Sequence, residues 1–199
     1  MNNHKKTWLA ALFLVWTTIC FAQTDILLDY NQGRLQKQKT GMLILGGWAI
    51  GNIAIGGAMM GNRTGEDRYF HQMNAAWNTI NLGIAALGYF SAMKADPAGF
   101  DLYNSMNEQH KLQKILLFNA GLDVGYMLGG VYLMERAKTA ENKPERLKGF
   151  GRSILLQGGF LFVFDIVNHI IHARGNAKIQ PLLDSLSLAP GKMGFVWQF

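Results

Sequence analysis

Three apolar segments of this chain each carry three polar residues at the same i, i+4, i+7 spacing. They are Asn74/Asn78/Asn81, Asn119/Asp123/Tyr126 and Asp165/His169/His172. On an α-helix, this spacing places each triplet within about 60° of one face. A buried Asp, or a buried Asn without a partner, is costly in an apolar environment. The three polar faces are therefore expected to meet inside a helical bundle. The pattern restricts the fold but names no substrate or reaction.

The apolar segments have the length of membrane spans. Four of them approach the roughly 20 apolar residues that cross a bilayer core, and they run approximately over 41–60, 73–93, 115–134 and 153–173. Charged residues make up 16% of the chain, below the ~25% of globular proteins. A soluble bundle would have charged outer faces, yet Asp123 is the only charge within 115–134. The sequence predicts an all-α membrane protein, with four transmembrane helices in an antiparallel bundle over 41–173.

The first 22 residues have the features of a secretory signal peptide. Lys5 and Lys6 precede an apolar stretch over 9–19 that is too short to span a membrane. Cleavage is expected after Ala22, and an uncleaved anchor is the alternative. Cys20, the only cysteine, would leave with the signal, so the mature chain would have no disulfide.

The flanks of the bundle are expected on its outer side. Residues 23–40 form a predicted outer amphipathic segment, and 174–199 form an outer tail. In that tail, Leu186 to Phe199 alternate around Pro190-Gly191, which predicts a short C-terminal β-hairpin. Six basic residues lie in the 135–152 loop, which favours a cytoplasmic position for it. These features predict a bacterial inner-membrane protein with both mature termini in the periplasm.

Counting along the spans pairs the polar residues by depth. Asp123 and Asp165 each lie eight residues from the outer end of their span, or about 12 Å deep. Asn119 and His169 are each four residues in. Two carboxylates at one depth cannot both ionise cheaply, so the acidic pair is expected to share a proton. The predicted polar network, or proton path, comprises Asn52, Asn74, Asn78, Asn81, Asn119, Asp123, Tyr126, Asp165, Asn168 and His169.

Three functions are compatible with this network. In the first, it is structural, and interhelical hydrogen bonds hold an accessory membrane protein together. In the second, Asp123, Asp165 and His169 carry protons or cations. In the third, Asp165, His169 and His172 bind a divalent metal in an intramembrane enzyme, with Asp123 as a fourth ligand. Haem ranks below metal because the sequence has no Cys-x-x-Cys-His signal.

Other features favour a non-enzymatic membrane protein without a cofactor. The sequence contains no phosphate-binding loop, nucleophile elbow or His-Glu-x-x-His motif. The formal charge of +6 falls to +4 without Lys5 and Lys6, too little to indicate a nucleic-acid partner. The expected partner is the lipid bilayer.

Two sets of glycines have the spacing of helix-packing motifs. Gly121, Gly125 and Gly129 form a stripe that faces away from Asp123, and Gly47 and Gly51 form a G-x-x-x-G pair. Small residues at this spacing let helix backbones approach closely. Packing inside the monomer is the favoured interpretation, and a homodimer through the span 115–134 stripe is the alternative.

Four stretches carry a family resemblance. They are LGGWAIGN (45–52), FHQMNAAWNTINLGIA (70–85), LLFNAGLDVGYM (116–127) and LLQGGFLFVFD (155–165). Through them the chain resembles an uncharacterised family of four-span membrane proteins from Bacteroidota with no assigned function. The resemblance implies the membrane architecture and brings no activity, cofactor or catalytic residue.

Overall fold

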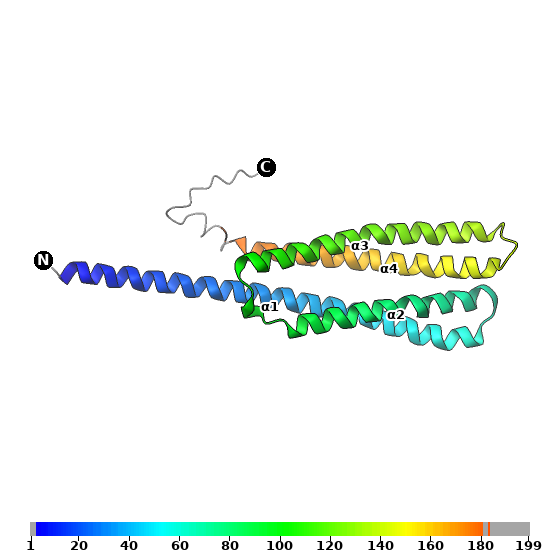
Figure 1. Cartoon of the computed structure of the whole chain (residues 1–199), viewed down its shortest axis with the longest axis horizontal. Helices are drawn as coiled ribbons and strands as arrows, with labels where there is room; N and C mark the ends of the chain where they lie inside the picture. Colours follow the sequence, from blue (N-terminus) through cyan, green and yellow to red (C-terminus); the bar gives the residue numbers. More distant parts are fainter. Residues whose placement is uncertain (1–2, 181–182, 184–199) are drawn as a thin grey trace.

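The computed structural model describes the backbone of residues 3–180 and 183, and the side chains from residue 25 onward. Within these residues the structure is entirely helical and contains no strand, which confirms the all-α prediction. The elements are α1 (Asn3–Asn62), α2 (Gly65–Lys94), η1 (Pro97–Gly99), α3 (Leu102–Ala137), α4 (Pro144–Gly175) and η2 (Asn176–Lys178) (Figure 1).

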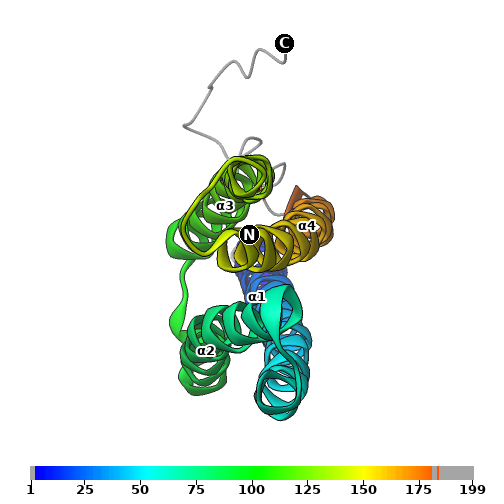
Figure 2. The ribbon, with the colours of Figure 1, turned by 90° about the vertical axis from the view of Figure 1, so that its right-hand side faces the viewer.

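The four helices form two antiparallel hairpins that lie against each other. Helices α1 and α2 form the first hairpin, and α3 and α4 form the second (Figure 1). Both tight connections lie at one end, here called the hairpin end. The segment 95–101 passes from one hairpin to the other at the opposite end, here called the crossover end. Seen end-on, the two hairpins form two layers (Figure 2).

The layers meet mainly along a seam between α2 and α4. Helices α1 and α4 share a much smaller contact, and α2 and α3 pack on their hairpin partners rather than on each other. This arrangement leaves a groove on each side of the seam. Both grooves are important for the sites described below.

Local chemistry explains where the helices begin and end. Helix α2 starts at Gly65, whose φ of +58° lies in the left-handed region that glycine tolerates best. The Asp101 side chain caps α3 by accepting a hydrogen bond from the Asn104 backbone N–H at 2.7 Å. Pro144 occupies the first turn of α4, where its missing N–H costs nothing. Extended backbone at Ala95 ends α2 two residues before Pro97.

The predicted outer segment 23–40 is not a separate element, because α1 continues through it without a break. Its buried face packs on the second hairpin near the crossover end. Asn31 Nδ2 donates to Ser105 Oγ at 2.9 Å, and Tyr30 packs with Ile179. These contacts explain why the helix persists beyond the predicted span.

Among the described residues three helices, rather than the predicted four, are long and apolar enough to cross a membrane: Asp25–Asn62 of α1, Leu102–Ala137 and Pro144–Lys178. Helix α2 has the length but not the mean hydropathy, because its three Asn residues lower the average. Those residues are buried inside the bundle, whereas its outer face is strongly apolar, with Ile80 67% and Leu87 76% exposed.

The predicted β-hairpin is not supported. Its residues, 186–199, lie outside the part of the chain that the structure describes, and the described part has no strand.

The glycines that bring helices together are not those that the sequence motif indicated. An added Cβ would meet nothing within 4 Å at Gly47, Gly51, Gly121, Gly125 or Gly129. Packing inside the monomer is therefore the wrong interpretation for these five positions, and a homodimer through the open α3 stripe stays a prediction. The close contact is made by Gly130 and Gly151. A Cβ on Gly130 would lie 2.7 Å from the Gly151 carbonyl oxygen.

An ion cluster joins α2 and α4 at the hairpin end. The Glu66 carboxylate accepts from Lys148 Nζ at 2.7 Å and from Arg152 Nη1 at 2.6 Å, and Asp67 lies 3.4 Å from the same Arg152 nitrogen. Lys148 and Arg152 hold the pKa of Glu66 below its ordinary value of 4.5.

Replacing Glu66 by Gln is expected to lower the thermal unfolding midpoint at neutral pH. The free energy of unfolding should fall by at most about 1 kcal/mol, because the ion pair is partly solvated. A carboxylate whose pKa is lowered in the folded state stabilises fully above its unfolded pKa. The difference in thermal midpoint between Glu66→Gln and the native protein should therefore become smaller as the pH falls below 4.5. Midpoints measured across this range, with the exposed-loop variant Glu141→Gln as control, check it. A midpoint difference that grows at acidic pH would contradict the stabilising role of Glu66 in the ion cluster.

Candidate functional site

A network of side-chain amides connects α1, α2 and α4 in the bundle interior. Asn74 is its centre. The Asn74 Oδ1 accepts from Gln157 Nε2 at 2.8 Å and from Ser153 Oγ at 2.8 Å. Its Nδ2 donates to Asn52 Oδ1 at 3.0 Å. One side chain of α2 is thus bound to both neighbouring helices.

Gln157 and Trp48 extend the network toward the crossover end. Gln157 is fully buried, and its Oε1 accepts from Trp48 Nε1 at 2.9 Å. The Trp48 ring stacks on Phe160 with centroids 3.9 Å apart. The Trp48 backbone carbonyl accepts from Asn52 Nδ2 at 2.9 Å. Trp48 and Ser153 were not predicted, because neither belongs to a repeated polar spacing.

The α2 triplet lies on the inner face, with Asn74, Asn78 and Asn81 all buried. Asn78 Nδ2 donates to the Asn74 backbone carbonyl at 2.9 Å, and Asn81 Nδ2 donates to Asn78 Oδ1 at 3.4 Å. The triplet therefore continues the network along α2 toward the groove between α2 and α3.

An acidic pair lies beside Asn81. Asp123 of α3 and Asp165 of α4 are 3% and 5% exposed, and their carboxyl groups are within hydrogen-bonding reach of each other. A hydrogen bond between two carboxyl groups requires a proton on one of them. The Asp123 Oδ2 atom is buried and has no hydrogen-bond partner among the described residues. The pair thus keeps unused hydrogen-bonding capacity at Asp123 Oδ2.

The acidic pair lines a cavity of about 400 Å³ in the groove between α2 and α3. Trp77 of α2 and Tyr126 of α3 bridge the groove, edge to face, with centroids 5.0 Å apart. Apolar side chains make up most of the rest of the wall. They are Leu45, Ile80, Ile84, Leu122, Leu161 and Phe164, joined by Asn81 and Asn119. The cavity therefore has a few polar groups in a largely apolar wall.

The other predicted network members lie elsewhere. His169 Nδ1 is 3.2 Å from the Gln113 backbone oxygen, rather than paired with Asn119. His172 is fully buried, with Nδ1 3.4 Å from Gln109 Oε1. Asn168 donates to a backbone carbonyl of its own helix at 2.8 Å. The network therefore divides into an amide part, an acidic pair, and histidines bound near the start of α3.

The geometry gives the metal hypothesis no support. Among the described residues, no three His, Cys, Asp or Glu side chains form a group that could hold a metal ion. His169 and His172 have their ring nitrogens against Gln113 and Gln109, so they do not converge with Asp165.

The comparison with protein families agrees with the resemblance to an uncharacterised family. The model of a family of unknown function, DUF6992, matches residues 44–166, more than half of the chain. The chain belongs to this family. The matched DUF6992 region contains the amide network and the acidic pair, but neither His169 nor His172. No curated protein and no solved structure matches the chain.

Proposed function

We propose that this DUF6992 protein is a four-span integral membrane protein in which α2 also crosses the bilayer. The apolar outer face of α2 supports this, because its polar residues are satisfied inside the bundle. The hairpin end, with the basic segment 135–152, would face the cytoplasm of a bacterial inner membrane, and the crossover end the periplasm.

The amide network in this proposal is the structural frame. Asn74 and Gln157 use both their donor and acceptor groups within the bundle. Amide side chains neither release nor take up protons near neutral pH. A proton path along these residues would need water between them. The network is therefore better suited to fixing the helices than to conduction.

The acidic pair in turn forms a ligand site. The single observation that supports it is the cavity of about 400 Å³, which opens onto Asp123 and Asp165. A mostly apolar cavity with a few convergent polar groups is typical of small-molecule sites. The ligand class that fits is an apolar molecule with a protonated amine. The amine would replace the shared proton and donate to both carboxylates. The protein would act as a membrane-embedded binding protein, without catalysis.

Labelling with a photoreactive long-chain alkylamine, in protein reconstituted into lipid nanodiscs, tests this function. Asp165→Asn is expected to lower saturable labelling about tenfold, because a charge-assisted hydrogen bond is lost. Leu122→Trp should do the same by filling the cavity. The matched photoreactive alcohol controls for apolar partition, and Asp25→Asn controls for loss of a carboxylate outside the cavity. Equal amine labelling of native protein and Asp165→Asn would rule out the site.

A further inference from the structure

Three basic side chains surround a small cavity at the crossover end. Arg34 and Lys37 of α1 and Lys178 of η2 line this cavity of about 30 Å³, which is room for a small polar group. The rest of the lining is Tyr30, Gly33, Gln109, His172 and Gly175. The cavity is separate from the acidic pair, and of its lining residues Gln109 alone falls within the family match.

Arg34 is buried, and in the described part of the chain no carboxylate lies within ion-pair distance of its guanidinium; Glu108 acts on it only from a longer distance. The Arg34 side chain is 6% exposed, and its Nε has no hydrogen-bond partner among the described residues. Arg34 Nη2 donates to Asn31 Oδ1 at 3.5 Å, and the guanidinium lies over the Phe100 ring at 4.7 Å. Neither neighbour carries a negative charge. A buried guanidinium in this state is costly unless an anion compensates it.

The other two cations leave the cavity with an excess of positive charge. Lys37 Nζ donates to the Ile171 backbone carbonyl at 3.3 Å, and in the described part of the chain it has no carboxylate within ion-pair distance. Lys178 is 3.0 Å from Asp29, so one of the three charges is paired. The cavity thus holds two cations, Arg34 and Lys37, that have no carboxylate within ion-pair distance among the described residues.

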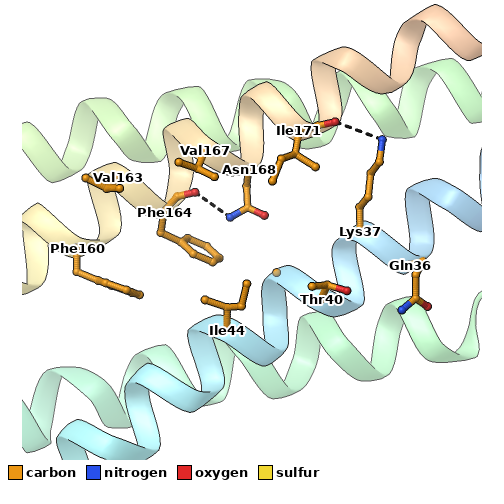
Figure 3. A pocket seen from close by; sticks show the side chains of 11 residues that line it. Gln36, Lys37, Thr40, Ile44, Phe160, Val163, Phe164, Val167, Asn168 and Ile171 are labelled. Carbon is orange, nitrogen blue, oxygen red and sulfur yellow. Dashed lines mark hydrogen bonds between the residues drawn. The ribbon is translucent and has the colours of Figure 1, made fainter.

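A second, apolar cavity begins where the basic one ends. It has a volume of about 370 Å³ and lies in the groove between α1 and α4. Lys37 lines both cavities. In Figure 3 its ammonium group reaches Ile171 at one end of the slot, while Ile44, Phe164 and Phe160 lie progressively further along it. The seven residues from Lys37 to Ile44 give this wall a length of about 10 Å.

The depth of the basic cavity matches a lipid phosphate. Lys37 lies four residues before the apolar stretch that starts at 41, and thus about 6 Å outside it. The headgroup region of a bilayer occupies about this distance on each side of the hydrocarbon core. From there the apolar slot extends toward the membrane centre, in the direction that an acyl chain takes.

We propose that a membrane phospholipid binds at the crossover end, with its phosphate on Arg34 and Lys37 and one acyl chain in the slot between α1 and α4. Guanidinium and ammonium groups are the usual ligands of phosphate oxygens, and the adjoining apolar slot favours a lipid over free phosphate. This inference uses the membrane placement proposed above and does not depend on the acidic pair.

Thermal unfolding of the full chain in detergent tests the proposal with three probes. They are phosphatidylglycerol, a diacylglycerol with the same chains, and inorganic phosphate. Phosphatidylglycerol is expected to raise the midpoint of the native protein in a saturable way, and the other two probes should not. Arg34→Gln with Lys37→Gln should weaken the apparent affinity at least about tenfold. Lys39→Gln removes one positive charge from the same helix outside both cavities, and should keep the native response.

A slot variant separates the two parts of the site. Val167→Trp fills the apolar cavity and should remove the response to phosphatidylglycerol while leaving Arg34 and Lys37 in place. Two results would overturn the proposal: an equal shift from inorganic phosphate, which would indicate a free-anion site, or an unchanged lipid response in the Arg34→Gln, Lys37→Gln protein. The amine-labelling experiment on Asp165 measures a different quantity. A negative result for one of the two sites therefore does not affect the test of the other.

Discussion

Replacing Gly130 by alanine is expected to lower the free energy of unfolding by about 1–3 kcal/mol, the usual cost of overpacking. The new Cβ would lie 2.7 Å from the Gly151 carbonyl oxygen and 2.9 Å from the Leu155 backbone nitrogen. Both are backbone atoms, so no change of rotamer can relieve the contact. Helices α3 and α4 would have to move apart where they are closest.

The neighbouring residue provides a matched control. A Cβ on Gly129 would meet nothing within 4 Å, so Gly129→Ala should be neutral or stabilise by up to about 1 kcal/mol through helix propensity. The two variants add the same methyl group to consecutive positions of one helix. Unfolding in a denaturing detergent, followed by circular dichroism, measures both. Similar free energies of unfolding for the two variants would contradict the close contact between α3 and α4 at Gly130.

Asn74→Leu is the second substitution with a large expected effect. It keeps the approximate side-chain volume but removes hydrogen bonds to Asn52, Ser153 and Gln157. Interhelical hydrogen bonds in membranes contribute about 0.6 kcal/mol each on average, and buried groups left without partners cost more. We expect a loss of at least about 2 kcal/mol in the same detergent unfolding assay.

Asn62→Leu makes the same chemical change at an exposed position. Asn62 donates one hydrogen bond, at 3.2 Å, to the Ala58 carbonyl of its own helix. Its replacement should cost well under 1 kcal/mol, in line with surface substitutions. If Asn74→Leu were as mild as Asn62→Leu, the amide network would not be the structural frame of the bundle.

Helical periodicity was enough to predict that the α2 triplet turns inward, although Tyr126 of the α3 triplet is 40% exposed. It placed Asn74, Asn78 and Asn81 on one buried face, because the 3.6-residue repeat fixes the direction of each side chain relative to its helix. Counting residues from the span ends matched Asp123 with Asp165, since depth along neighbouring helices depends only on the rise per residue. These arguments use a single helix at a time.

The same arguments could not predict which helix each face meets. The glycine stripe on α3 had the spacing of a packing motif, yet the packed glycine is Gly130, one residue beyond Gly129 and about 100° around the helix. Arg34 likewise belongs to none of the repeated polar spacings, yet the fold buries it against the Phe100 ring. The rotation of a helix against its neighbours comes from packing of the whole bundle, and a one-dimensional pattern does not contain it.

The amide network also has a consequence for the protein while it is being synthesised, because its members are added at different times. The ribosome releases α1 and α2 first, with Asn52 and Asn74 facing each other, whereas Ser153 and Gln157 arrive only with the last helix. During translation the first hairpin therefore exists for a time without the hydrogen bonds that Ser153 and Gln157 later make to it. Until α4 has been synthesised, the polar side chains of the first hairpin must therefore contact water, lipid headgroups or the insertion machinery.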